Sequence, residues 1–398
     1  MSLRSLIIST VMVMMVITGC RRGPMGLEEP SLSDACSYLW DQQQRDGAWH
    51  SETHALLKGG QALTPFVLWA LMEVPDSIYY KEPRKIQKAI NFLRRQVDQY
   101  GHLGKADQDI LEYPNYSSAY ALMVLSRYGT MEDQPRIRKL QQYLVSQQFA
   151  EHRGIEPHHL IYGGWGFGED LAWGEHGQVD LSHTRRVLQA LQISGYAMDS
   201  LKDKSQHFLH LLQKHPQETR PQPAMLIDTL NAGYDGGFYY SPVILGANKG
   251  QQDLTGQFMS YPTATCDGFL SWQVFGAGRE ESKDALEWLK GHPSWDKWDH
   301  LNEQAQTWAR AMQYYHIMVR TEVYRQAQYQ HDWVTAIPSW LGQKQRADGS
   351  FVNPIGAISK EDDPLLTTTM AVTALNNCRE IRQLQHSKHA LKASLRGI

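Results

Sequence analysis

Short apolar segments recur along the chain with a common internal spacing. In most of them one apolar residue stands three positions before another, as Leu68 stands before Leu71 and Leu122 before Leu125. Alanine, serine and threonine fill many of the positions between. This spacing with small neighbours is typical of a buried, closely packed helix. It predicts buried helices in residues 63–71, 117–125, 183–191, 265–273 and 367–375, with Gln273 replacing the second apolar residue in the fourth segment.

Amphipathic segments lie between the buried ones, with charge and glutamine on one side, as expected of outer helices. They are residues 89–96, 140–148, 207–214, 285–290 and 337–345. Together the two kinds of segment make about six helical hairpins at a period of roughly 50–75 residues, longer than a two-helix solenoid repeat. Closure into a ring would leave no terminal repeat exposed. We therefore expect an all-α fold, an α6–α6 toroid of about six helical-hairpin repeats with inner helices forming a barrel.

Nearly the same letters occur at both ends of this repeat array, as QQQRDGAW in residues 42–49 and QKQRADGSF in residues 343–351. The Asp-Gly pair stops an outer helix, because glycine adopts the left-handed conformation at little cost. The aromatic residue then packs as a buried anchor, and the glutamine amide bonds groups at helix ends. We expect a structural role and no catalytic role for these residues: Gln43, Asp46, Gly47, Trp49, Gln345, Asp348, Gly349 and Phe351.

The QQQRDGAW stretch resembles the QW motif of squalene–hopene and oxidosqualene cyclases, and QKQRADGSF resembles a looser copy of it. The loops GGWGF and DGGFYYSP resemble the same superfamily, which includes the β-subunits of protein prenyltransferases. The resemblance covers residues 34–378 and implies an α/α toroid. In such a toroid the inner helices begin around one mouth of a central cavity, where backbone N–H groups and helix dipoles converge. The candidate cavity residues at these helix starts are Tyr116, Asp180, His183, Cys266, Asp267 and Thr367.

The catalytic signatures of the superfamily are missing. No DxDD acid cluster and no DDxxD run occur, and the acidic group at 361–363 is expected to cap a helix. The stretch CDGFLSW at 266–272 resembles a scrambled form of the prenyltransferase zinc site, and the later histidine is replaced by threonines. An acid assembled from Asp180 and Asp267, and a metal set of Asp180, His183 and Cys266, stay open as alternatives. We expect no metal and no cofactor.

The N-terminus has the features of an export signal. Arg4 precedes an apolar run of about a dozen residues, too short to span a membrane. Residues 17–20, Ile-Thr-Gly-Cys, resemble the lipobox of bacterial lipoproteins, which implies that Cys20 carries acyl chains such as palmitate. We expect a lipoprotein signal peptide at 1–19, a lipidated tether at 20–33, the toroid at 34–378 and a tail at 379–398. This organisation places the protein in a bacterial cell envelope, on a membrane face that the sequence leaves open.

The charge and the cysteine content limit the classes of partner that we expect for this chain. The net charge is −3 with interspersed signs, which argues against a nucleic-acid partner. The three remaining cysteines are scattered and make no disulfide framework. We expect a membrane-anchored module without catalytic activity that binds a protein, or an apolar small molecule, peptide or glycan, as its ligand. The alternative is a divergent terpene cyclase that uses an unrecognised acid in the central cavity. A prenyltransferase-like enzyme is a third possibility, which requires zinc, a partner α-subunit and a prenyl diphosphate.

Overall fold

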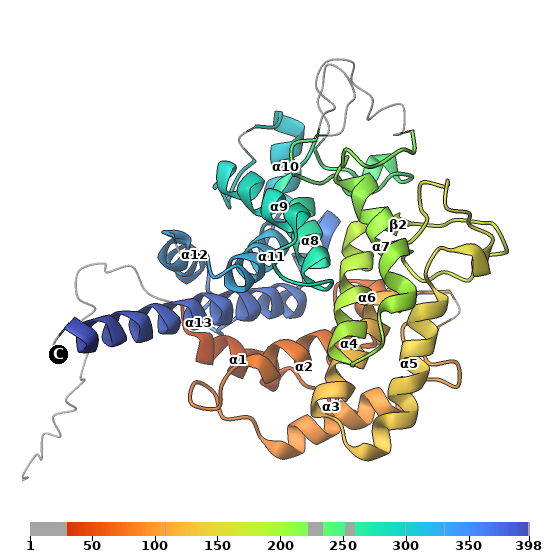
Figure 1. Cartoon of the computed structure of the whole chain (residues 1–398). Helices are drawn as coiled ribbons and strands as arrows, with labels where there is room; N and C mark the ends of the chain where they lie inside the picture. Colours follow the sequence, from red (N-terminus) through yellow and green to blue (C-terminus); the bar gives the residue numbers. More distant parts are fainter. Residues whose placement is uncertain are drawn as a thin grey trace, which may run out of the picture.

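Six helices that are buried on most sides form an inner ring. They are α2 (Leu63–Glu73), α4 (Pro114–Tyr128), α6 (Leu181–Ile193), α8 (Pro262–Gln273), α11 (Gln313–Gln326) and α13 (Pro364–Arg396). Each packs against the next in chain order, and α13 packs against α2, which closes the ring (Figure 1). The predicted α6–α6 toroid is confirmed. Helix α13 continues beyond the ring toward the C-terminus and includes residues 379–396 of the predicted tail (Figure 1).

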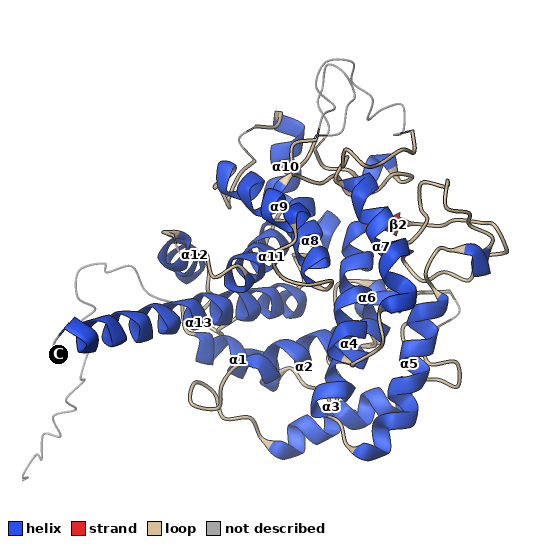
Figure 2. Ribbon diagram, viewed as in Figure 1, coloured by secondary structure: helices blue, strands red, loops and turns tan. Residues whose placement is uncertain are grey.

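The structure is a computed structural model that describes residues 30–107, 109–221, 234–250, 259–298, 300–329 and 331–396. The predicted signal peptide at 1–19, Cys20 and most of the tether lie outside these ranges. The described residues are almost entirely helix and loop (Figure 2), and their single sheet pairs β1 (Trp165–Gly166) with β2 (Val179–Asp180) antiparallel. Among the described helices, none combines the length and apolar composition that crossing a membrane requires.

An outer layer of helices wraps the ring. It contains α1 (Leu32–Asp41), α3 (Pro83–Gln96), α5 (Gln134–Ser146), α7 (Asp199–Leu212), α9 (Glu280–Gly291) and α12 (Trp333–Gly342). The predicted outer segments fall on α3, α5, α7, α9 and α12, and each packs against an inner helix. The fifth repeat is degenerate, because it has no glycine between its outer helix α9 and its inner helix α11, and in it an additional helix α10 (Glu303–Ala311) precedes α11.

The repeated glycine lies in the loop after an outer helix and packs on the next outer helix. The expectation that Asp-Gly itself ends the outer helix is wrong, because α1 already ends at Asp41 and α12 at Gly342. Five such glycines have a positive φ, and a Cβ on any of them would overlap the backbone of the following outer helix. The pairs are Gly47 with Lys88, Gly101 with Lys139, Gly163 with Lys204, Gly236 with Asp284 and Gly349 with Asp34. Since Gly349 packs on α1, the last copy of the motif closes the outer layer onto the first helix.

The glutamines of the motif bridge the same junctions. The Gln43 amide donates to the carbonyls of Gly47 and Lys85, at 3.0 and 2.9 Å. Gln345 donates to the carbonyls of Gly349 and Ser31 and accepts from the Ser31 N–H. These residues therefore lie at helix junctions in the outer layer, away from the centre of the ring.

The anchor that follows each glycine fixes the start of an inner helix. The anchor's backbone N–H donates to a hydroxyl in the first turns of that helix. The pairs are Trp49 with Thr64, Leu103 with Ser118, Trp165 with Thr184, Phe238 with Thr265 and Phe351 with Thr368, at 2.9–3.1 Å. Through these bonds the motif sets the position of the inner-helix starts, where the cavity lies.

Candidate functional site

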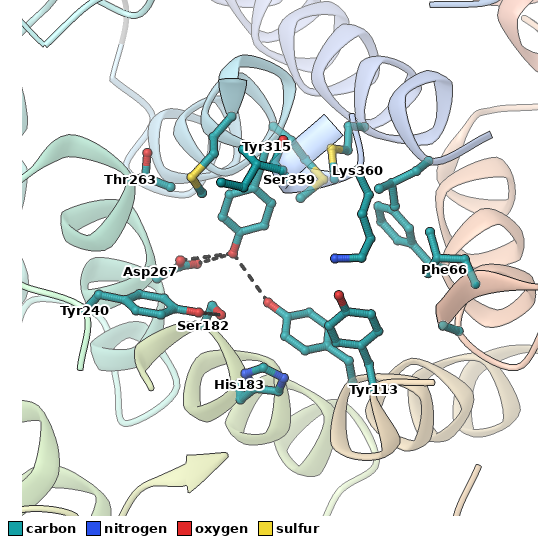
Figure 3. Close-up of a pocket in the computed structure, with 18 of the residues that line it drawn as sticks. Phe66, Tyr113, Ser182, His183, Tyr240, Thr263, Asp267, Tyr315, Ser359 and Lys360 are labelled. Atoms are coloured by element: carbon teal, nitrogen blue, oxygen red, sulfur yellow. Dashed lines mark hydrogen bonds between the residues drawn. The ribbon is translucent and has the colours of Figure 1, made fainter. Parts of the chain in front are cut away.

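A cavity of about 340 Å³ lies inside the ring at the N-terminal ends of the inner helices (Figure 3). Every inner helix contributes two or more lining residues from its first turns: Leu63 and Phe66 from α2, Tyr116 and Tyr120 from α4, Ser182 and His183 from α6, Thr263 and Asp267 from α8, Tyr315 and Met318 from α11, and Leu366 and Met370 from α13. Loop residues complete the rim. The wall is mainly aromatic and aliphatic, so most of the surface offered to a ligand is apolar.

Asp267 places a carboxyl group in this wall. Its two oxygens lie 3.0 and 3.2 Å from the Tyr315 hydroxyl, which in turn lies 3.4 Å from the Tyr116 hydroxyl (Figure 3). Burial raises the pKa of Asp267 from 3.8 to about 7, although the Arg185 charge and the Tyr315 hydrogen bond act in the opposite direction. The side chain is therefore a carboxyl group that exchanges its proton near neutral pH.

Tyr315 reaches this position because the start of α11 is capped by Glu361. The Glu361 carboxylate accepts the backbone N–H groups of Tyr314 and Tyr315, at 3.1 and 2.7 Å. Nearby, Asp363 accepts the N–H of Leu366 in the first turn of α13. The capping role expected for the acidic group at 361–363 is thus seen at two helix starts, since each carboxylate complements a helix N-terminus.

Asp180 and His183 form a second polar pair at the start of α6. Asp180 caps the helix through the His183 N–H and lies 2.8 Å from His183 Nδ1, with Ser182 and Gln178 as further donors. Burial alone would raise the pKa of Asp180, but the charge and hydrogen bonds of His183 lower it to about 2. His183 lines the cavity, and no described residue hydrogen-bonds its buried Nε2. This nitrogen is therefore available to form a hydrogen bond with a ligand in the cavity.

Two lysines lie at the rim. The Lys360 ammonium sits 5.4 Å from the centre of the Tyr113 ring, and its side chain extends into the cavity (Figure 3). Lys249 lies 4.4 Å from the Trp308 ring centre, and burial lowers the pKa of this lysine to about 8. The polar groups of the cavity thus include two cations at the mouth, which favour an anionic or electron-rich group there.

A charged layer closes the opposite end of the barrel. The buried Arg185 forms an ion pair with Glu322, and Arg186 stacks 4.2 Å over the Tyr120 ring. Phe66, Tyr120 and Met318 line both the cavity and a smaller polar pocket beyond it. These three side chains are the apolar floor of the cavity.

The structure separates the six candidate cavity residues into two groups. Tyr116, His183 and Asp267 line the cavity, and Asp180 lies directly behind His183. Cys266 and Thr367 were expected at the cavity, but they are fully buried and absent from its lining. Burial raises the pKa of Cys266 to about 12, and the Thr367 hydroxyl donates to the Glu361 carbonyl. Both face the packing between helices.

Neither composite site left open by the sequence is formed by the described residues. The ligand atoms of Asp180, His183 and Cys266 do not gather around one point. Asp180 hydrogen-bonds with His183 and Asp267 with Tyr315, and within the described part of the chain no hydrogen bond joins the two carboxyl groups. Sequence reasoning missed Tyr315 and Lys360, which come from the degenerate repeat and from a rim loop. A usable signal for Tyr315 was its place in the first turn of a buried helix.

Comparison with known proteins identifies the fold. No family model matches the chain, and no curated protein matches it in sequence. Among solved structures it is similar to the type II terpene cyclase MstE from Scytonema, solved in complex with geranylgeranyl dihydroxybenzoate. The TM-score is 0.51 at 12% identity, over 88% of this chain and 97% of the cyclase. The ligand-free form of that cyclase matches with a TM-score of 0.51 and 13% identity, over 88% of this chain and 98% of the other.

A glycoside hydrolase family 76 mannosidase from Bacteroides thetaiotaomicron also matches, with a TM-score of 0.43 and 11% identity, over 89% of this chain and 99% of the mannosidase. At these identities the matches concern the fold. Together with the closed ring of inner helices, the two matches to the cyclase show that the chain has a terpenoid cyclase-like α/α toroid fold.

Proposed function

We propose that the toroid binds an elongated, mainly apolar molecule in its central cavity, as part of a lipoprotein held on a bacterial envelope membrane by Cys20. The observation that carries the proposal is the cavity itself, with apolar walls and the unpartnered Nε2 of His183. Pockets for small molecules combine such walls with a few placed polar groups.

The size and lining of the cavity favour a lipid-like or isoprenoid chain over a glycan or a peptide. An engineered cavity of about 150 Å³ holds one benzene ring, so 340 Å³ has room for roughly a dozen carbon atoms. A glycan of that volume would need hydrogen-bond partners along its whole length, and the wall formed by Phe66, Met318, Leu366 and Met370 supplies none. The polar contacts are concentrated instead at His183, at Asp267 and at the rim.

The rim indicates how such a chain would be oriented. Lys249 and Lys360 favour an anionic head group at the mouth, with the apolar tail directed toward the floor. The MstE ligand, geranylgeranyl dihydroxybenzoate, joins a long chain to an acidic ring. A ligand of this general chemistry suits the cavity, and we propose an amphiphile with an acidic head.

Binding is tested by titrating the purified protein with farnesoic acid, farnesol and maltotriose. We expect the acid to bind most tightly, the alcohol more weakly, and the glycan not at all. Leu366→Trp fills the cavity and should abolish binding. Leu384→Trp, the same change at an exposed position farther along α13, should leave binding unaltered. Equal affinity in both variants would refute binding in the cavity.

The anchor is tested separately. Replacing Cys20 with serine should move the protein from the membrane fraction to the soluble fraction and abolish incorporation of labelled palmitate. A Cys20→Ser variant that stays with the membrane would contradict the lipoprotein assignment and would leave the cavity proposal untouched.

A second candidate function, a divergent terpene cyclase, is favoured by Asp267. In this reaction the Asp267 carboxyl transfers its proton to an alkene carbon, and the Tyr315 hydroxyl stabilises the carboxylate that remains. Aromatic faces such as Tyr120 and Phe66 attract the resulting carbocation. A second alkene of the same chain attacks this cation, which forms the ring bond and moves the positive charge to another carbon. His183 Nε2 then removes a proton from a carbon beside the new cation, so that a double bond forms and the product is a cyclic isomer of the substrate.

The two functions are distinguished by mass spectrometry of the recovered ligand. A cyclised product formed by the wild type and lost in Asp267→Asn, while binding is retained, would establish the cyclase. If both proteins return the ligand unchanged, the cyclase is excluded for this ligand and the binding function is supported.

A further inference from the structure

Two histidines and a glutamate lie together in the outer layer, at the junction between α7 and α9. His210 is in the last turn of α7, His215 follows three residues after the helix ends, and Glu281 is in the first turn of α9. Their possible ligand atoms all lie within 4.8 Å of one another. We propose that His210, His215 and Glu281 form a binding site for a divalent transition-metal ion, with zinc as the reference ion.

The donor set and spacing suit this chemistry. Two imidazole nitrogens and one carboxylate oxygen are a known zinc set that leaves a fourth position for water. Bonds of about 2.0–2.1 Å place the ligands of tetrahedral zinc about 3.3 Å apart. His210 Nε2 and Glu281 Oε1 already lie 3.2 Å apart, and the two histidine rings stack with their centres separated by 4.4 Å. Binding therefore requires His215 to rotate toward the other two ligands.

The surrounding backbone is held by a buried side chain. Gln213 donates to the carbonyls of Glu281 and Gly236, at 2.9 and 3.0 Å, and accepts from the Trp272 indole at 3.0 Å. The His210 ring packs against Trp272, with 5.1 Å between ring centres. Gln213 thus fixes the end of α7 relative to the start of α9, so two of the three ligands are positioned before an ion arrives.

Arg279 supplies a test specific to this site. Its guanidinium donates to Glu281 Oε1 at 2.7 Å and lies 4.8 Å from the Trp272 ring centre. A metal ion must displace this cation from Glu281 and is repelled by it while it stays near. Removing the guanidinium should therefore strengthen metal binding. If the three residues only hydrogen-bond to one another to stabilise the fold, the same change would not increase the affinity for zinc.

The experiment is a zinc titration of the full chain after chelator treatment, read by calorimetry and repeated with cobalt for its absorption spectrum. We expect one ion per chain. His210→Ala, His215→Ala and Glu281→Gln should each weaken binding at least tenfold, and Arg279→Gln should tighten it severalfold. His207→Ala removes a histidine from the same helix outside the cluster and should change nothing. Circular dichroism verifies that each variant is folded.

Two further readouts complete the test. Zinc should raise the thermal midpoint of the wild type and of His207→Ala but not of His210→Ala, because the ion links α7 to α9 in the folded state. The cobalt spectrum should show nitrogen and oxygen ligation without a thiolate band. Absence of zinc binding at micromolar concentrations, or equal affinity in the wild type and His210→Ala, would overturn the proposal. A thiolate band would overturn it as well, because it would assign the ion to a cysteine.

Discussion

Replacing Asp267 with asparagine removes the charge of the buried carboxyl while nearly preserving its shape. The pKa of Asp267 is raised from 3.8 to about 7 in the folded protein, chiefly by burial. The folded state therefore holds this proton more tightly than the unfolded state does. The contribution of the group to stability is full below pH 3.8 and is lost as the pH rises to 7. Over that interval the loss is about 4 kcal/mol, at 1.4 kcal/mol per pKa unit.

Between pH 5 and pH 8 the same relation gives a loss of about 2.6 kcal/mol for this one group. We expect wild-type stability to fall by that much more than the stability of Asp267→Asn over the range, measured by urea unfolding at each pH. Glu361 is also buried with a pKa raised to about 7, but it contributes equally to both proteins and cancels in the difference. Asp34→Asn, at an exposed position on α1, should behave as the wild type does. Parallel pH profiles for the wild type and Asp267→Asn would refute the raised pKa.

Three further predictions concern ring closure and the rim. Gly349→Ala should destabilise the protein by about 3 kcal/mol or more in thermal unfolding, because its Cβ would lie 2.4 Å from the Asp34 carbonyl oxygen; Gly195→Ala, with positive φ but open space, should cost only about 1–2 kcal/mol. Gln345→Ala removes two hydrogen bonds to Ser31 at the start of the first helix and one to Gly349 within the last repeat, and should cost about 2–3 kcal/mol in the same assay. Burial lowers the pKa of Lys249 to about 8, so affinity for an acidic ligand should fall as the pH rises through 8. That fall should disappear in Lys249→Met, and its persistence there would assign the pH dependence to another group.

The architecture could be predicted from the sequence because each repeat is specified locally. The repeated glycine packs on the next outer helix, the anchor two residues later donates a hydrogen bond to the start of an inner helix, and the glutamine of the motif bonds to the following outer helix. Gly47 and Gly349 do this at opposite ends of the chain, and Gly349 completes the ring against Asp34. Such contacts join adjacent repeats and involve only a few residue types. A repeated pattern of these residues in the sequence is therefore enough to predict the toroid.

The chemistry of the cavity could be predicted only in part, because it depends on contacts between repeats. Asp267 has its raised pKa because α8 buries it and because Arg185 and Tyr315 counter that effect only partly. Tyr315 comes from the one repeat whose motif is degenerate, and its position is set by Glu361 in another loop. Nothing in the local sequence of α8 specifies these neighbours.

The two misplaced cavity residues, Cys266 and Thr367, have one geometric cause. Both stand at the start of an inner helix, but the face of the helix decides which side chains reach the cavity. Cavity-lining residues on α4, α8 and α13 are four positions apart, as Tyr116 and Tyr120 are, and Asp267 and Met370 are the second members of such pairs. Cys266 and Thr367 each lie one residue from a lining position, and one residue turns a side chain by about 100° around a helix with 3.6 residues per turn. The four-residue spacing of the cavity-facing positions therefore includes Asp267 and excludes Cys266, although the two residues are adjacent in the same buried turn.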